Sequence, residues 1–183
     1  MIVISLGSNV AGRWGHPKDT FRRAIRELAA CGIQSIGISK IYLSEAHAYF
    51  PQPSFFNATI IVKTTLPPAA LLQVLKIIEA EAGRSKPRSG GLPYFRWMPR
   101  PLDLDIVCYN TVVCNWWGFR PQAHARVTLP HPRAHERAFV LRPLSEAAPF
   151  WHHPVFGKTA GQLLKRPKVR DTGKILGSED FPI

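Results

Sequence analysis

Four short segments within the first 110 residues are rich in Ile, Leu, Val and Phe, and this pattern predicts β-strands. They cover residues 2–6, 33–43, 55–64 and 102–110. The first is followed by Gly-Ser-Asn, a typical turn sequence. The second alternates Ile with polar residues imperfectly, and we expect one continuous strand there. This part of the chain therefore predicts a sheet of four strands.

Two longer segments between these strands have apolar side chains three or four positions apart, which predicts amphipathic helices. The first covers residues 16–32, with Pro17 near its start and Gly32 closing it. The second covers residues 69–84 and ends at Gly83. Proline is favoured in the first turn of a helix and glycine just after the last turn, so both segments have the boundaries expected of helices.

The order of these elements is β-α-β-β-α-β, the arrangement of a ferredoxin-like α+β fold. In that fold an antiparallel sheet carries both helices on one face, and we expect the opposite face to be open for a site. We assign residues 1–160 to a single domain and residues 161–183 to an irregular C-terminal extension of it. After residue 110 we also expect a short strand pair, 111–114 with 125–129, and a short helix near 142–148.

The composition restricts the ligands and the cellular compartment that we expect for the protein. Lys and Arg number 24 against 12 Asp and Glu, and a formal net charge of +12 attracts polyanions such as nucleic acid or nucleotide phosphate. The basic residues are spread over many segments, which favours a globular protein over a disordered nucleic-acid arm. No apolar run approaches the ~20 residues that span a bilayer, and three cysteines are too few for a disulfide framework. We expect a cytoplasmic monomer that does not bind membranes.

Asp103 and Asp105 stand one residue apart in the last predicted strand, among Leu, Ile and Val. In an extended strand both carboxylates project from the same face, while Leu104 and its apolar neighbours project from the other. Two close anions repel, so a cationic group must compensate them, either a divalent metal or arginine. The alternative is a pair of solvated carboxylates at the end of a strand.

A basic segment precedes this strand and contains Arg84, Arg96 and Arg100, with Gly90 and Gly91 between them. A flexible cationic loop beside two carboxylates suits phosphate transfer, because metal and arginine can neutralise a phosphate from two sides while a lid excludes water. Taken alone, the loop is more typical of a solvated basic loop than of a site.

Two further segments carry polar or aromatic groups that could bind a ligand. His131 and His135 have helical spacing, but no third ligand pattern supports zinc, whereas His131 and Arg137 could reach a phosphate as charged donors. Phe55 and Asn57 share one face of a predicted strand, where a flat heterocycle could stack on the ring and hydrogen-bond the amide. The alternatives are a surface turn and a phenylalanine packed in the core.

Taken together, these motifs resemble one known family. "LGSN", "PSFFNAT", "IEAEAGR", "RWMPRPLDLDIVCYN" and "LPHPRAHERAFVLRPL", in this order, resemble 6-hydroxymethyl-7,8-dihydropterin pyrophosphokinase of folate biosynthesis. The likeness spans roughly residues 1–150, and its most specific part is the R-x-x-D-x-D motif with the P-H-P-R-x-x-x-R-x-F segment. It implies transfer of the diphosphoryl group of ATP to the pterin hydroxymethyl oxygen, with release of AMP.

The resemblance also implies roles for individual positions. Two Mg²⁺ ions would be held by Asp103 and Asp105, and Arg84 and Arg100 would act on the transferring phosphates, so these four residues are the implied catalytic set. The implied ATP-binding residues are Glu79, Arg96, Trp97, Ile106, Arg126, Thr128, His131 and Arg137. The implied pterin-binding residues are Ser44, Phe55, Asn57 and Phe139.

Two other functions remain open at this point. A basic ferredoxin-like sheet with exposed aromatic residues could bind single-stranded RNA. The two carboxylates argue against nucleic acid, because they would repel its backbone. The second open function is that of a pyrophosphokinase acting on a related, modified pterin. The sequence does not distinguish it from the pyrophosphokinase that the resemblance implies.

Overall fold

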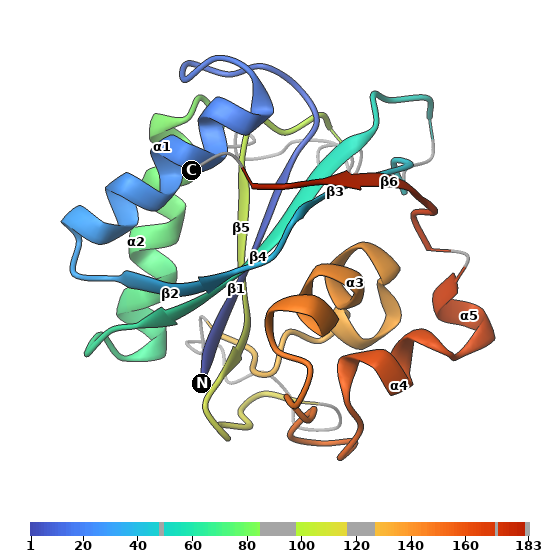
Figure 1. Ribbon diagram of the computed structural model, residues 1–183. Coiled ribbons are helices and arrows are strands. Elements are labelled where there is room, and N and C mark those ends of the chain that lie inside the picture. Colours follow the sequence, from blue (N-terminus) through green and yellow to red (C-terminus); the bar gives the residue numbers. More distant parts are fainter. Residues whose placement is uncertain (48–49, 85–97, 117–126, 171, 182–183) are drawn as a thin grey trace.

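The computed structural model describes residues 1–47, 50–84, 98–116, 127–170 and 172–181, and is built on one antiparallel sheet (Figure 1). The strand order is β5-β1-β4-β3-β6, with β2 also paired to β4. The strands are β1 (Ile2–Ser8), β2 (Gln34–Ile38), β3 (Ile41–Ser44), β4 (Phe55–Lys63), β5 (Asp103–Tyr109) and β6 (Ile175–Glu179). The predicted α+β class is confirmed.

Helices cover both faces of this sheet (Figure 1). The helices are α1 (Pro17–Ala30), α2 (Pro68–Glu81), the short 3₁₀ helix η2 (Ala134–Glu136), α3 (Ala138–Ala147), α4 (Ala160–Leu164) and α5 (Pro167–Arg170). Gly32 and Gly83 have φ values of 74° and 103°, the left-handed conformation that ends α1 and α2 as predicted. In the described segments, no helix has the length and apolar character needed to cross a membrane.

The alternation of side chains along β1 divides the interior into two layers. Ile2, Ile4 and Leu6 point toward α1 and α2 and join the larger buried cluster. Val3 points the other way, into a second cluster with α3 and α4. The expectation of a wholly open second face is therefore wrong, because α3 covers one end of it.

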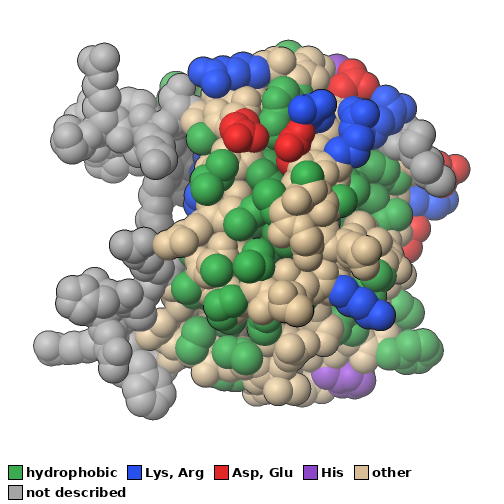
Figure 2. All heavy atoms as spheres, turned by 90° about the vertical axis from the view of Figure 1, so that its left-hand side faces the viewer, with side chains coloured by type: hydrophobic (Ala, Val, Ile, Leu, Met, Phe, Trp, Pro, Cys, Tyr) green, Lys and Arg blue, Asp and Glu red, His purple; other side chains and the backbone are tan. Residues whose placement is uncertain are grey.

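The outer side of α1 and α2 is seen in Figure 2, where apolar side chains occupy the middle of the surface and charged ones gather near its upper edge. Ile77 of α2 contributes to the apolar character, with 58% of the residue exposed. The middle of this surface therefore carries little charge.

Residues 33–43 form two strands, so the prediction of one continuous strand is wrong. The chain leaves the β-ladder at Ser39, whose hydroxyl accepts a hydrogen bond from the Thr59 backbone at 2.9 Å and donates one to Lys40 O at 2.7 Å. A polar side chain that bonds the backbone locally competes with regular strand pairing. Both β2 and β3 still pair with β4.

The end of the chain is more ordered than the sequence pattern predicts. Ile175–Glu179 form β6, which pairs with β3 at the edge of the sheet, so the expectation of an irregular extension is wrong here. The predicted strand pair after residue 110 is reduced, in the described residues, to a single bridge between Cys114 and Leu129. The helix expected near 142–148 begins earlier, at Ala138.

Candidate active site

A cavity of about 320 Å³ opens on the second face of the sheet, where the cover of α3 ends. Across β4, β1 and β5, side chains on this face change from apolar to polar or small. Gly7 lies between Asn57 and Asp103 in the strand register, and Ser5 lies next to Asp105. Both carboxylates line the cavity while Leu104 is buried on the opposite face, as strand alternation predicts.

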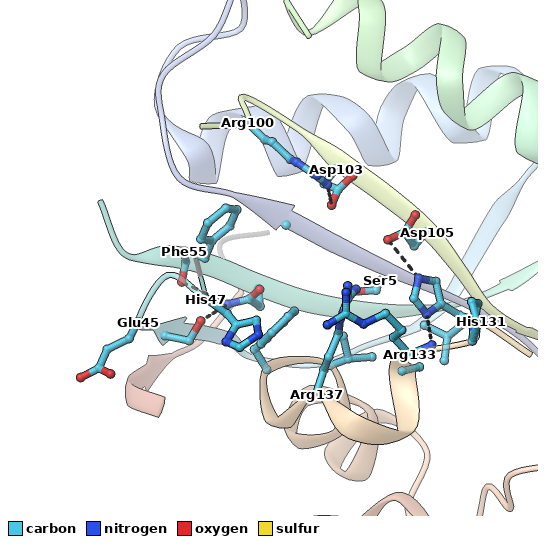
Figure 3. A pocket seen from close by; sticks show the side chains of 18 of the residues that line it. Ser5, Glu45, His47, Phe55, Arg100, Asp103, Asp105, His131, Arg133 and Arg137 are labelled. Atoms are coloured by element: carbon cyan, nitrogen blue, oxygen red, sulfur yellow. Dashed lines mark hydrogen bonds and ion pairs between the residues drawn. The ribbon is translucent and has the colours of Figure 1, made fainter. Parts of the chain in front are cut away.

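Asp103 is neutralised by two arginines. Arg84 donates to its Oδ1 and Arg100 donates to its Oδ2, so each carboxylate oxygen has a guanidinium partner (Figure 3 shows Arg100). Burial acts to raise the pKa of Asp103, but these arginines together with Lys76 outweigh it and hold the pKa at about 2. Arginine therefore compensates the carboxylate pair in the protein itself.

The free edge of β5 is held by two side chains of α2. Oε1 of Glu79 accepts from the Leu104 backbone N–H at 2.7 Å, and Nζ of Lys76 donates to the Leu104 carbonyl at 3.1 Å. Only 4% of the Glu79 side chain is exposed, and the same oxygen is 2.7 Å from Lys76 Nζ and from Arg84 Nη1. The pair fixes the strand between the two aspartates and holds Arg84 beside them.

The turn after β1 fixes Arg100. Oδ1 of Asn9 accepts from the Arg100 backbone N–H at 2.7 Å, and the Asn9 N–H donates to the Arg100 carbonyl at 3.0 Å. Ser8 donates through its hydroxyl to Pro101 O at 2.6 Å. These two buried polar residues anchor the chain just before β5 and so place the Arg100 guanidinium.

A second group of basic side chains faces Asp105 from the segment before α3. His131 Nε2 lies 3.7 Å from Oδ2 of Asp105, and its Nδ1 accepts from the Arg133 N–H at 3.1 Å (Figure 3). Burial lowers the pKa of His131, and Asp105 acts against that fall. Arg137 also lines the cavity, and burial together with Arg133 lowers its pKa. Among the described residues, the buried Nε of Arg137 has no hydrogen-bond partner.

The far end of the cavity is aromatic and contains the four residues assigned to pterin. Phe55 and Phe139 both line it, as do Ser44 and Asn57. The side-chain nitrogen of Asn57 donates to Ser44 Oγ at 3.0 Å and to Phe55 O at 3.1 Å. Carboxylates of β5, arginines from the segments that precede β5 and α3, and aromatic rings of β4 and α3 thus line one cavity.

Comparison with known proteins agrees with this arrangement. Residues 3–149 match the family model described as 7,8-dihydro-6-hydroxymethylpterin-pyrophosphokinase. The chain belongs to this pterin pyrophosphokinase family.

Curated relatives include proteins that are named as pyrophosphokinases of the hydroxymethyl-dihydropterin. A 2-amino-4-hydroxy-6-hydroxymethyldihydropteridine pyrophosphokinase of Synechocystis is 38% identical over 165 residues, covering 90% of this chain and 74% of that protein. The Bacillus subtilis protein of that name is 34% identical over 144 residues, which are 78% of this chain and 75% of the relative. The chain is also similar to a folate synthesis bifunctional protein of Arabidopsis thaliana, at 41% identity over 143 residues, but spans only 26% of its length.

Several residues implied by the pterin pyrophosphokinase resemblance are not brought into the cavity. The Ile106 side chain is buried in the core under α1 and α2, and Glu79, Arg84 and Thr128 are not among the residues that line the cavity. Arg84 and Glu79 reach the site through their contacts with Asp103 and Leu104. The backbone groups of Leu104 bond to α2, so those of Ile106, two residues on, point to the same free edge. Arg96, Trp97 and Arg126 lie outside the described residues, as does the predicted glycine-containing lid.

Sequence reasoning gave no role to Ser8, Asn9, Lys76, Arg133 or His47. The "LGSN" motif contains the first two, but only their buried contacts to Arg100 and Pro101 reveal what they do. The Lys76–Glu79 spacing of three residues on one helix was the available signal for Lys76. Arg133 and His47 line the cavity beside Arg137, and Arg133 adds to its positive charge. Burial together with Arg133 and Arg137 lowers the pKa of His47, which favours its neutral form.

The donor set is suitable for magnesium supplied with a nucleotide. In the described segments, no group of three or more His, Cys, Asp or Glu residues could hold a metal ion. Asp103 and Asp105 provide hard carboxylate oxygens on one face of β5. Mg²⁺ is commonly bound by one or two carboxylates together with substrate phosphates, so this pair fits such an ion in a pterin pyrophosphokinase.

Proposed function

We propose that this chain transfers the diphosphoryl group of ATP to the hydroxymethyl group of 6-hydroxymethyl-7,8-dihydropterin in folate biosynthesis. The hydroxymethyl oxygen forms a bond to the β-phosphorus and loses its proton, the bond from that phosphorus to the α-phosphate oxygen breaks, and AMP leaves. The observation that carries the proposal is a single cavity in which Asp103 and Asp105 face cationic side chains next to aromatic rings.

Basic side chains bind and orient the triphosphate in this proposal. Arg84 and Arg100 lie at Asp103 and would neutralise charge on the transferring group, while His131 and Arg137 approach from the opposite wall. Burial of a guanidinium whose Nε has no described partner favours an anionic ligand at Arg137. Phosphoryl-type transfer depends mainly on alignment and charge neutralisation, and these residues can supply both without a dedicated base.

Other implied residues complete the nucleotide site in this proposal. The outward backbone groups of Ile106 can read the edge of the adenine base, and Glu79 acts by holding Arg84 and β5. Arg96, Trp97, Arg126 and Thr128 remain proposals based on the family resemblance.

Asp103 and Asp105 would hold two Mg²⁺ ions that arrive with ATP. Bound magnesium supplies charge neutralisation and templating for the phosphates. The two carboxylates would hold that charge on one face of β5. Each oxygen of Asp103 keeps a second lone pair while a guanidinium occupies the first.

The pterin ring stacks between Phe55 and Phe139 in this proposal. The side-chain nitrogen of Asn57 donates hydrogen bonds to Ser44 and to backbone carbonyls. Its amide oxygen is therefore the group that would hydrogen-bond to the edge of the pterin. Ser44 acts by fixing that amide. We also propose a cytoplasmic monomer. Three free cysteines support a reducing compartment.

The test is to incubate the protein with ATP, MgCl₂ and the hydroxymethyl-dihydropterin and to separate the nucleotides. The expected product is AMP, and formation of ADP instead would indicate a monophosphoryl kinase. Arg137→Met should reduce turnover about 10²-fold or more, as expected for loss of a charge that stabilises the transition state. Arg142→Met in α3, exposed and away from the cavity, is the matched control and should retain activity.

A further inference from the structure

The segment Thr172–Glu179 lies beyond the residues that match the family model, yet it contacts one wall of the pterin end of the cavity. The backbone N–H of Glu45 donates to the Lys174 carbonyl at 2.9 Å. Next to it, Ile175 pairs with Ser44 in the β6–β3 register. Ser44 and Glu45 both line the cavity, so this segment forms the outer support of their strand.

The same segment supports the opposite wall, at the start of α3. The Thr172 hydroxyl accepts from the Ala138 backbone N–H at 3.2 Å and lies 2.7 Å from the Glu136 carbonyl, to which it can donate. Ala138 is the first residue of α3, whose early N–H groups have no partner inside the helix. Thr172 therefore fixes the turn that carries Phe139.

Gly173 connects the two walls directly. It is buried and has a φ of +63°, a conformation that L side chains rarely adopt. A Cβ at this position would lie 2.8 Å from Cδ1 of Phe139 and 3.3 Å from the Glu45 carbonyl oxygen. Glycine therefore lets the backbone lie against the Phe139 ring and against Glu45 at the same time.

We propose that Thr172, Gly173 and Lys174 are positioning residues for the pterin, because they set the separation between the Phe139 wall and the Ser44–Glu45 wall. The inference rests on the proposed function and extends it to a segment outside the family match. Lys174 contributes through its backbone carbonyl, Thr172 through its hydroxyl and Gly173 through the absence of a side chain. None of the three has to touch the substrate to act in this way.

The test compares Gly173→Ala with Gly177→Ala, a control in the same segment. Gly177 pairs with Leu43, and a Cβ there would meet nothing within 4 Å. Displacement of the Phe139 ring should weaken pterin binding about tenfold, as judged from the energies of stacking on aromatic rings. Binding of ATP with magnesium should not change, and Gly177→Ala should match the wild type for both ligands. Calorimetric titration of each ligand measures this difference, and thermal unfolding measures stability separately.

A second pair of variants tests the inference even where Gly173→Ala does not fold. Thr172→Val removes the hydroxyl at nearly constant volume and should raise the pterin KM with little change in the ATP KM, whereas Thr172→Ser should restore it. Equal losses for pterin and ATP, or wild-type pterin binding in both Gly173→Ala and Thr172→Val, would overturn the inference. A wild-type protein that binds no pterin and forms no AMP would overturn the proposed function, and the inference with it.

Discussion

Replacement of Asp103 by Asn tests whether arginine, rather than metal alone, compensates the carboxylate pair. On charge repulsion alone, removal of one of two adjacent anions would stabilise the protein without magnesium. The structure predicts the opposite sign, because Arg84 and Arg100 each bond one oxygen of Asp103. Asp103→Asn leaves both half-buried guanidiniums without their anion and should lower the free energy of unfolding.

The magnitude follows from the pKa of the carboxyl group. A fall from the ordinary value of 3.8 to about 2 means that the ionised form is favoured in the folded protein. At ~1.36 kcal/mol per pKa unit, this contributes about 2 kcal/mol to stability at neutral pH. Because the folded pKa is the lower one, the contribution is present above pH 3.8 and is lost as the pH falls through about 2.

Urea unfolding at pH 7 in EDTA measures the effect, with Asp105→Asn as the matched control. Asp105 is 3.7 Å from His131 Nε2 and 3.9 Å from Lys76 Nζ, beyond hydrogen-bond distance, so its replacement should change stability by about 0.5 kcal/mol or less. A stabilised Asp103→Asn variant, or equal changes in the two variants, would refute this account of charge compensation. Both variants should still lose most of their turnover when magnesium and ATP are present.

Three further predictions concern other parts of the molecule. Phe139→Ala should weaken pterin binding by about 1–3 kcal/mol in calorimetry, while the affinity for ATP stays nearly constant. Lys76→Met should lower turnover more than it raises either KM, because β5 and Arg84 lose a support; unchanged kinetics would exclude that role. Burial lowers the pKa of His153 to about 4, so unfolding experiments should show stability at its full value above pH 6.5 and declining between pH 6.5 and 4. His153→Gln should flatten that decline, and an unaltered slope would assign it to other groups.

The parts of the fold that follow from local pattern are the parts that the sequence predicts correctly. Period-two alternation placed Asp103 and Asp105 on one face and Leu104 on the other, and the structure has this arrangement. Helical spacing with a terminal glycine likewise predicted the end of α1 and α2. β6 has no comparable signal, because Ile-Leu-Gly-Ser-Glu is a weak strand sequence that becomes ordered by pairing with the edge of β3.

The candidate site likewise has a part that could be predicted from the sequence and a part that could not. Residue types suited to phosphate and to a flat ring could be selected from the sequence, and those described in the structure mostly line one cavity. The supporting contacts could not be predicted, because Asn9 reaches Arg100 across 91 positions and Thr172 reaches Ala138 across 34. Such contacts depend on which segments the folded chain brings together, and the types of residue involved do not reveal them.

The attachment of α2 to the edge of β5 has a consequence for the behaviour of the protein at high concentration. An edge strand with unpaired backbone groups can recruit a strand from another molecule and begin aggregation. At Leu104 both backbone groups are already bonded to Lys76 and Glu79, and the charged Lys76 side chain lies at that edge. The contacts that hold the site together therefore also protect an exposed strand from pairing with a second chain.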